Sequence, residues 1–343
     1  MIQEKITERT LHAIQEKVFP GCVIGVVTKN GAREVFPSGH FTYEPNSAHV
    51  REDTIYDVAS ITKSIPTASL VLLLMAEGRL QGAKLVREYL PELQNDHEAT
   101  VEDLLAYRVS GPRLSVLREK TPENMLAHIF EQGFEPRAEA KYTNLPALLL
   151  GLIVERAAGD TFEHLAQARF FTPLHMERTT FFPFRDLPDK KDEIAPTEID
   201  EWRGDVHGFP HDESAYVFAK SGRVVGHAGL FSTAPDMLNF LEALLHPAHD
   251  GDTTSIMGLI ADGAQKGLGW QRAELWFTGT RFGAGAFGKT GFTGTSVVVD
   301  PQHGIAFVIL SNRTYPKRPP DAASIHSAIN TFRADIADIL LSA

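Results

Sequence analysis

The chain has 343 residues, more than twice the usual size of one domain, so it can bury a large core and divide into two lobes. Hydrophobic residues make up 43% and charged residues 22% of the chain, a composition that excludes a disordered or fibrous protein. Its 33 Lys and Arg residues against 44 Asp and Glu give a net charge of −11, which argues against nucleic acid or an anionic membrane as a partner. The single Cys22 excludes an internal disulfide.

The first 19 residues alternate charged and apolar side chains like an amphipathic helix and lack the apolar centre of a signal peptide. The longest apolar runs, residues 70–76 and 145–154, are shorter than the roughly 18 residues that a membrane-spanning helix needs. We therefore expect a cytoplasmic protein without membrane insertion. A periplasmic or extracellular location would require a signal sequence that had been removed.

After the opening helix, two apolar runs at 22–28 and 32–36 flank Asn30-Gly31, which is a strong hairpin signal. Helical periodicity follows at 60–77, 101–107, 122–131, 145–158, 162–170 and 234–245. Strand-like runs return at 294–299 and 304–310, before a final helix at 322–341. The polar stretch 186–211 is expected to be a long surface loop, either bordering a substrate site or serving as a plain connector.

Strands at both ends and helices in the middle predict an α+β fold, in which terminal helices flank one antiparallel sheet and a mainly helical lobe is inserted. We expect residues 1–59 and 262–343 to form the discontinuous sheet lobe and residues 60–261 the helical lobe. An active site would lie in the cleft between the two lobes.

A serine and a lysine three residues apart open the first predicted core helix. Residues at this spacing share a helix face, so the Lys63 nitrogen is expected to reach the Ser60 hydroxyl and activate it as a nucleophile. The alternative is a helix-capping serine beside an exposed lysine.

Two further motifs favour the catalytic interpretation. Tyr142 and Asn144 precede a predicted helix, and Lys289-Thr290-Gly291 precedes a predicted strand. Taken singly, the tyrosine is as readily a core residue, and the lysine a solvated residue at a strand edge. The order Ser-Lys, Tyr-Asn, Lys-Thr-Gly along one chain strengthens all three motifs.

With these motifs the sequence resembles the serine β-lactamase and penicillin-binding-protein family, in its class C-like branch, which includes D-stereospecific peptidases and carboxylesterases. The resemblance runs over nearly the whole chain. Its blocks are 56–63 (YDVASITK), 77–80 (EGRL), 89–91 (YLP), 142–144 (YTN), 150–155 (LGLIVE), 172–174 (TPL), 194–198 (IAPTE), 206–207 (VH), 226–233 (GHAGLFST), 267–270 (GLGW), 288–296 (GKTGFTGTS) and 310–313 (LSNR).

The resemblance implies that Ser60 is the acylated nucleophile and that Lys63 and Tyr142 move its proton. It also implies an oxyanion hole made by the backbone N–H groups of Ser60 and Phe292. A lysine base needs a lowered pKa, which a closed cleft and the nearby Lys289 ammonium would favour.

The resemblance further implies that Asn144 binds the amide side chain of the substrate, and that Lys289 and Thr290 contact a substrate carboxylate or support Tyr142. Lys289 is a fixed cation near neutral pH, so it favours an anionic substrate. The substrate-binding set is therefore Asn144, Thr290, Gly291 and Phe292, and the catalytic set is Ser60, Lys63, Tyr142 and Lys289.

The chain departs from the family pattern in two places. Many relatives carry a Thr-His-Thr-Ser-Gly-like segment where this chain has 106–111 (AYRVSG), a difference expected to touch no catalytic position. Many esterases and peptidases of the branch have His before Thr-Gly, whereas Lys289 is the form of β-lactamases and D,D-peptidases.

The histidines are interpreted as structural. His227 is expected to be buried rather than to support the site, and His207 and His211 near two aspartates lack a third ligand at metal-binding spacing. We therefore expect no metal and no cofactor.

The resulting prediction is a serine hydrolase that forms an acyl-enzyme with a small amide or ester, such as a D-amino-acid peptide or muropeptide-type compound. Carboxylesterase and β-lactamase activities are the alternatives within this class. A catalytically silent penicillin-binding-like sensor is the alternative of another class. The oligomeric state is left open.

Overall fold

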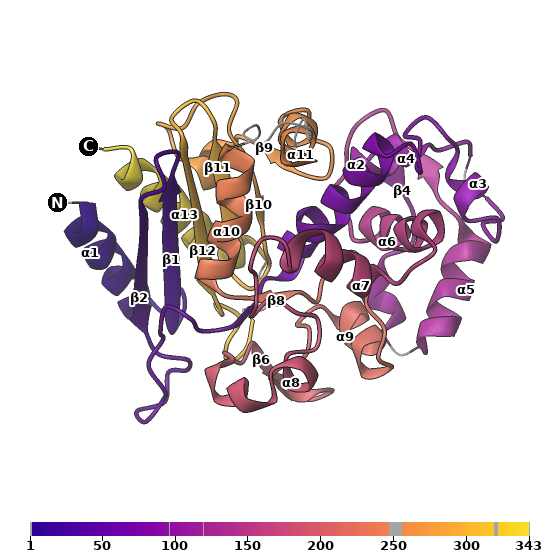
Figure 1. Ribbon diagram of the computed structural model, residues 1–343. Helices are drawn as coiled ribbons and strands as arrows, with labels where there is room; N and C mark the ends of the chain where they lie inside the picture. The colour runs from indigo at the N-terminus through magenta and orange to yellow at the C-terminus, as the bar shows by residue number, and fades with distance from the viewer. Residues whose placement is uncertain (1, 96, 119, 247–255, 319–321, 343) are drawn as a thin grey trace.

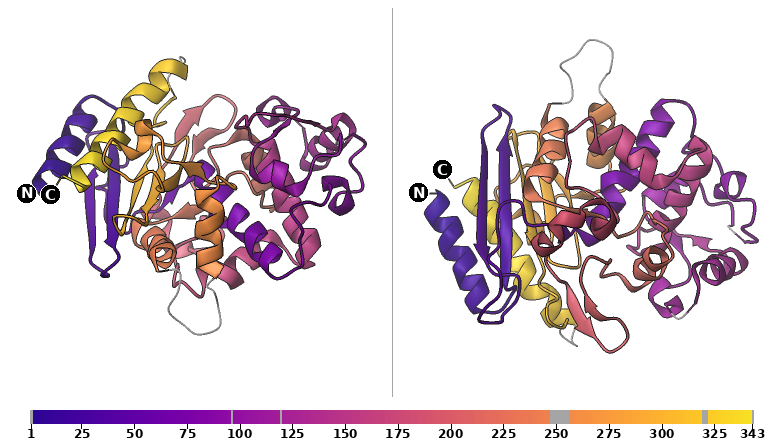
Figure 2. Two further views of the ribbon diagram at one scale, coloured as in Figure 1. Left: turned by 90° about the horizontal axis from the view of Figure 1, so that it is seen from above. Right: turned by 60° about the horizontal axis from the view of Figure 1, so that its bottom comes forward.

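A computed structural model of the protein describes residues 2–95, 97–118, 120–246, 256–318 and 322–342. It has two lobes side by side, one built on a β-sheet and the other mainly helical (Figure 1). Both chain ends lie on the sheet lobe, next to each other (Figure 2). This arrangement confirms the predicted α+β class and the antiparallel sheet flanked by terminal helices; the limits of the two lobes stay a prediction.

The sheet has six antiparallel strands in the order β2-β1-β12-β11-β10-β9. Its hairpin β1 (Gly21–Thr28) and β2 (Arg33–Gly39) turns at Asn30-Gly31, as predicted. The N-terminal β1 then pairs with β12 (Ile305–Ser311), where Gly25 lies opposite Val308. The remaining strands are β11 (Ser296–Asp300), β10 (Phe287–Thr290) and β9 (Gln271–Arg272). The sheet therefore joins the two ends of the chain directly.

Helices cover both faces of this sheet. One face packs against α1 (Ile2–Gln15) and α13 (Ala322–Leu340), through alternate residues of β12 such as Phe307 and Ile309. The other face packs against α10 (Ala234–Leu245) through the intervening Val308. Every residue of β12 is buried, because a strand covered on both faces has no solvent side.

The helical lobe surrounds α2 (Ser69–Ala76), against which α6 (Leu145–Ala158) and α11 (Ile256–Gln265) pack. The other helices of this lobe are α3 (Val86–Tyr89), α4 (Val101–Leu105), α5 (Pro122–Gln132), α7 (Phe162–Ala166), α8 (Pro183–Asp186) and α9 (Glu213–Lys220). In the sheet lobe, α12 (Leu275–Thr278) packs against α13. Short strand pairs join β3 (Tyr56–Asp57) to β8 (Phe231–Ser232) and β4 (Val109–Ser110) to β5 (Glu135–Pro136).

The predicted helix at 60–77 is interrupted near its start. A 3-10 turn at Ala59–Lys63 and a π turn at Ser64–Ala68 precede α2, because Pro66 cannot donate a backbone hydrogen bond and forces Ile65 out of helical geometry. By length and hydropathy Ala59–Ala76 could cross a bilayer, although the uninterrupted apolar runs did not indicate it. Since 83% of this segment is buried inside the protein, we interpret it as the central core helix.

One expectation about local structure is wrong, and one strand was missed. The stretch 186–211 is not a plain loop, because it contains a 3-10 helix at Pro188–Glu193 and a hairpin of β6 (Glu198–Asp200) and β7 (Gly204–Val206). Lys289 precedes the strand β11, as predicted, but it also lies within a strand that the sequence did not indicate, β10, opposite Val297 of β11. Strands of two to four residues are too short to display a period of two, so the sequence pattern misses them.

Candidate active site

Ser60 is presented by a strained turn directly after β3. The preceding Ala59 has a φ of 50°, in the left-handed region that residues with a side chain rarely adopt. The buried Asp57 holds this turn, since its carboxylate accepts a hydrogen bond from the Ala59 N–H at 2.8 Å and from the His211 N–H at 2.6 Å. Burial raises the pKa of Asp57 above its usual value. The turn thus fixes Ser60 at the edge of the helical lobe.

Lys63 lies against Ser60, as the three-residue spacing predicted. Its Nζ donates to Ser60 Oγ at 2.8 Å and to the His227 backbone carbonyl at 2.7 Å. Only 1% of Lys63 is exposed, so its amine is aimed at the serine by the surrounding core. This contact is the arrangement that proton transfer from Ser60 requires.

Lys289 is enclosed by two tyrosine rings. It is 1% exposed, and its Nζ lies 4.8 Å from the centre of the Tyr107 ring, 4.5 Å from that of Tyr142, and 3.2 Å from the Tyr107 hydroxyl, to which it donates. Burial, and then the charge of Lys63, hold the pKa of Lys289 well below its usual value. No carboxylate pairs with Lys289 in the part of the chain that the structure describes.

This geometry corrects one expectation. Tyr107 belongs to the 106–111 segment, which was expected to touch no catalytic position, yet its hydroxyl holds Lys289. The sequence offered no signal for this contact, because it joins residues 182 positions apart.

Tyr142 lies across the mouth of the site and is 51% exposed. It turns its ring toward both lysines, with Lys63 Nζ 5.3 Å from the ring centre, and it packs on Tyr107 at 5.2 Å between ring centres. Among the described residues, no hydrogen bond joins the Tyr142 hydroxyl to Ser60. The aromatic ring of Tyr142 therefore faces the lysines beside the predicted path of the proton.

Asn144 does not line the cavity at Ser60 but begins a partly buried polar chain. Its Nδ2 donates to Asp212 at 2.8 Å, and the Asp212 carboxylate also accepts from the Ser214 hydroxyl at 2.6 Å and contacts His227 Nε2 at 3.1 Å. Although burial opposes it, the contact with His227 holds the pKa of Asp212 well below its usual value. The His227 carbonyl then accepts from Lys63, so this chain links Asn144 to the lysine that contacts Ser60.

A cavity of about 430 Å³ opens in front of the serine. It is lined by Ser60, Tyr142, Gln271, Glu274, Trp276, Thr290, Gly291, Phe292, Asn330 and Arg333. Five of the predicted site residues are thus brought together on its wall. Lys63 and Lys289 contact Ser60 and Tyr142 from behind it.

The wall opposite the helical lobe is the end of β10. Gln271 Oε1 accepts from both the N–H and the hydroxyl of Thr290, at 3.1 Å each, which fixes the threonine. Gly291 follows, and a Cβ there would lie 2.0 Å from Thr295 Oγ1 and 2.6 Å from the Val58 carbonyl. Only glycine allows the strand to pass this close to the turn that carries Ser60.

Arg333 of α13 is a further site residue that the sequence did not reveal. It is 2% exposed, donates to the carbonyls of Gly291 at 3.0 Å and Thr295 at 2.7 Å and to Asn330 Oδ1 at 2.9 Å, and leaves Nε without a partner. Burial, and then the charge of Arg313, lower the pKa of Arg333 to about 9. No carboxylate among the described residues pairs with its guanidinium. A buried cation without a counter-ion favours an anionic ligand in the adjoining cavity.

The predicted oxyanion-hole residue Phe292 is fixed by stacking. The His211 ring lies 5.4 Å from it at an interplanar angle of 25°, and the guanidiniums of Arg313 and Arg318 lie 5.0 and 5.5 Å from its centre. Glu198 ties this group together, because it accepts from Arg318 and lies 3.1 Å from His211 Nε2.

The two histidines considered as metal ligands face different partners. His207 Nε2 contacts the Ile194 carbonyl at 2.9 Å, whereas His211 pairs with Glu198. Within the described ranges no three His, Cys, Asp or Glu side chains converge on one point.

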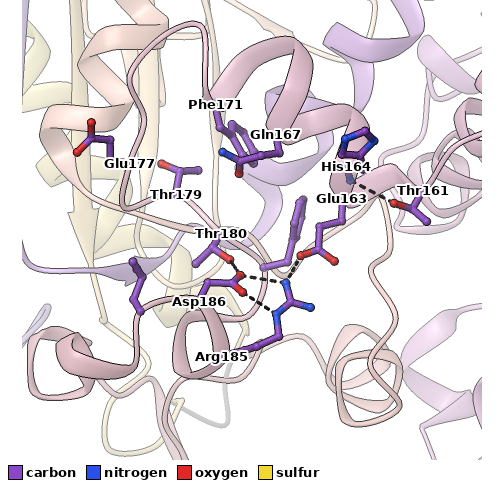
Figure 3. A pocket seen from close by; sticks show the side chains of 12 residues that line it. Thr161, Glu163, His164, Gln167, Phe171, Glu177, Thr179, Thr180, Arg185 and Asp186 are labelled. Carbon is purple, nitrogen blue, oxygen red and sulfur yellow. Dashed lines mark hydrogen bonds and ion pairs between the residues drawn. The ribbon is translucent and has the colours of Figure 1, made fainter.

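A second cavity, of about 420 Å³, lies between α7 and α8 (Figure 3). Arg185 pairs there with Glu163 and Asp186, and Asp186 also accepts from Thr180. Glu177 lies on its rim and is exposed. Most of these charges neutralise one another, and none of the predicted site residues lines this cavity, so the cavity at Ser60 is the candidate active site.

Comparison with known proteins fits this geometry. The sequence profile of the family described as Beta-lactamase matches residues 7–329. A protein of Escherichia coli O157:H7, provisionally named D-alanyl-D-alanine carboxypeptidase, is 30% identical over 311 residues, covering 76% of this chain and 70% of its own. The N-acetylmuramyl-L-alanine amidase of Bacillus subtilis (strain 168) is 25% identical over 350 residues, covering 87% and 78%.

Solved structures share the fold. The β-lactamase/D-alanine carboxypeptidase of Pseudomonas syringae superposes with a TM-score of 0.75 at 20% identity, covering 100% of this chain and 99% of its own. A class C β-lactamase of Rhodobacter sphaeroides gives 0.73 at 19% identity, covering 98% and 99%.

Proposed function

The chain belongs to the Beta-lactamase family of serine hydrolases, and from that premise we propose that Ser60 forms an acyl-enzyme with a small, carboxylate-bearing amide or ester. The observation that carries this proposal is the 2.8 Å contact between Lys63 Nζ and Ser60 Oγ at the edge of a cavity. A catalytically silent sensor can lose either residue, so the intact contact between a buried amine and Ser60 favours an enzyme.

The reaction follows from the positions of the groups. Lys63, as the free amine, takes the proton of Ser60 while Oγ attacks the substrate carbonyl. The negative charge that develops on the carbonyl oxygen is bound by the backbone N–H groups of Ser60 and Phe292. The proton then passes to the leaving group, with Tyr142 beside the path, and water hydrolyses the acyl-enzyme by the same steps.

The charge around the cavity supports an anionic substrate. Arg333 lies on the wall, and among the described residues it has no carboxylate partner. A carboxylate on the substrate would satisfy the guanidinium. Together with the names of the relatives, this charge favours a D-amino-acid peptide or muropeptide-type compound over a neutral ester.

The test is intact-protein mass after exposure to D-alanyl dipeptides, activated esters, a fluorophosphonate and penicillin, followed by peptide mapping. We expect an adduct on Ser60, and no turnover or adduct for Ser60→Ala. Ser221→Ala, which removes an exposed serine hydroxyl at the end of α9, is the matched control and should still be labelled. Labelling of a different serine would contradict the assignment, and stable acylation by penicillin alone would point to the sensor.

A further inference from the structure

The wall formed by β9 and α12 carries a carboxylate that the proposed reaction does not use. Glu274 stands at the N-terminus of α12, where a Ser, Thr, Asp or Asn side chain often accepts from the first backbone N–H groups of the helix. Here it caps nothing, and its Oε2 instead accepts from the indole N–H of Trp276 at 2.8 Å. The bond holds the carboxylate and the indole together on the wall of the Ser60 cavity.

The rest of this wall leaves that carboxylate available. Glu274 is exposed, and no described cation pairs with it, although α12 packs against the helix that carries Arg333. Among the described lining residues of the cavity, Glu274 is the carboxylate and Arg333 the guanidinium. The same cavity therefore presents one negatively charged and one positively charged group to a ligand.

We propose that Glu274 and Trp276 form a subsite for a primary ammonium group, so that the preferred substrate is zwitterionic. The carboxylate of the substrate is directed to Arg333, and its amine is directed to Glu274 and Trp276. An ammonium ion is attracted both to a carboxylate oxygen and to the face of an indole ring, and a wall that combines the two selects a charged amine over an amide. This inference rests on the proposed hydrolysis at Ser60 and narrows its substrate class.

The experiment compares two esters that differ only in the amine, D-alanyl-D-lactate and N-acetyl-D-alanyl-D-lactate. Glu274→Gln removes the charge while keeping an oxygen for the Trp276 N–H. We expect the wild-type protein to prefer the free amine, and the ratio of the two kcat/KM values to fall about 5- to 10-fold in Glu274→Gln, as suits a partly exposed ion pair. Trp276→Leu should lower the same ratio.

The control is Glu177→Gln, which removes one exposed carboxylate at the separate cavity of Figure 3 and should leave the ratio unchanged. An unchanged ratio in Glu274→Gln, or a wild-type preference for the acetylated ester, would overturn the proposal and leave Glu274 as a partner of Trp276 only.

The failure of the proposed function would look different. If Ser60→Ala still hydrolysed the esters, the assignment of Ser60 as the nucleophile would be wrong, whatever the ratio of the two kcat/KM values. If the wild-type protein hydrolysed neither ester, the binding of both esters would be measured by calorimetry, in Ser60→Ala and in the double variant Ser60→Ala, Glu274→Gln. A preference of Ser60→Ala for the free amine that is lost in the double variant would support the ammonium subsite, and an unchanged preference would overturn it.

Discussion

Removing one hydroxyl, in Tyr107→Phe, tests whether Lys289 acts as a cation in the reaction. The ring stays, so the packing on Lys289 and Tyr142 is kept, but the acceptor 3.2 Å from the ammonium is lost. A hydrogen bond to a charged group contributes about 1.5–3 kcal/mol, which corresponds to about a 10- to 150-fold loss in kcat/KM if the reaction needs the protonated lysine. Burial keeps the Tyr107 hydroxyl protonated, since it raises the pKa of this phenol well above its usual value.

The direction of the pH effect follows from the same contact. The hydroxyl stabilises the ammonium form, so its loss lowers the pKa of Lys289 further. If activity depends on protonated Lys289, kcat/KM falls as the pH rises through that pKa, and this alkaline limb moves to lower pH in Tyr107→Phe. The assay is hydrolysis of a carboxylate-bearing ester from mildly acidic to alkaline pH.

Tyr89→Phe is the matched control, because its hydroxyl accepts from the Gln81 N–H on a different part of the helical lobe. A Tyr107→Phe profile that overlays the wild-type profile, or an alkaline limb that moves to higher pH, would refute the reasoning and leave Lys289 as a structural residue.

Three further predictions follow from the site. Arg333→Met should lower kcat/KM for a carboxylate-bearing ester by about 10- to 100-fold, and kcat/KM for the corresponding methyl ester much less. Lys289→Ala should lower kcat/KM for both esters alike, because Lys289 lies behind Tyr142 and does not line the cavity. Equal losses for the two esters in Arg333→Met would contradict this division of roles. Because the pKa of Asp212 is lowered in the folded protein, its carboxylate stabilises the fold at pH values above the ordinary carboxyl pKa, and this stabilisation is lost as the pH falls through the lowered pKa. Asp212→Asn should therefore have a smaller free energy of unfolding than the wild-type protein at neutral pH, and this free energy should decrease less on acidification. Urea unfolding at neutral and acidic pH measures both differences. Exhaustive chelation should leave hydrolysis unchanged, and a loss that zinc restores would show that a metal had been overlooked.

Local order was largely predictable. The Asn30-Gly31 hairpin, the helices at 145–158 and 234–245 and the contact of Lys63 with Ser60 all depend on residues close in sequence, where the backbone period sets the geometry. The family resemblance then indicated the fold and the hydrolase class, which a single local motif could not.

The sequence by itself determined the strands β1, β2, β11 and β12, most of the longer helices and the hydrolase class, and it predicted Ser60 as the nucleophile, because these depend on residue type and short spacing. Only the tertiary structure decided which groups surround that nucleophile. It placed Tyr107 on Lys289, turned Asn144 to Asp212 instead of the cavity, and brought Arg333 of the last helix to the wall. These contacts join segments that meet only when the two ends of the chain share one sheet, so packing of the whole core, and no local pattern, sets them.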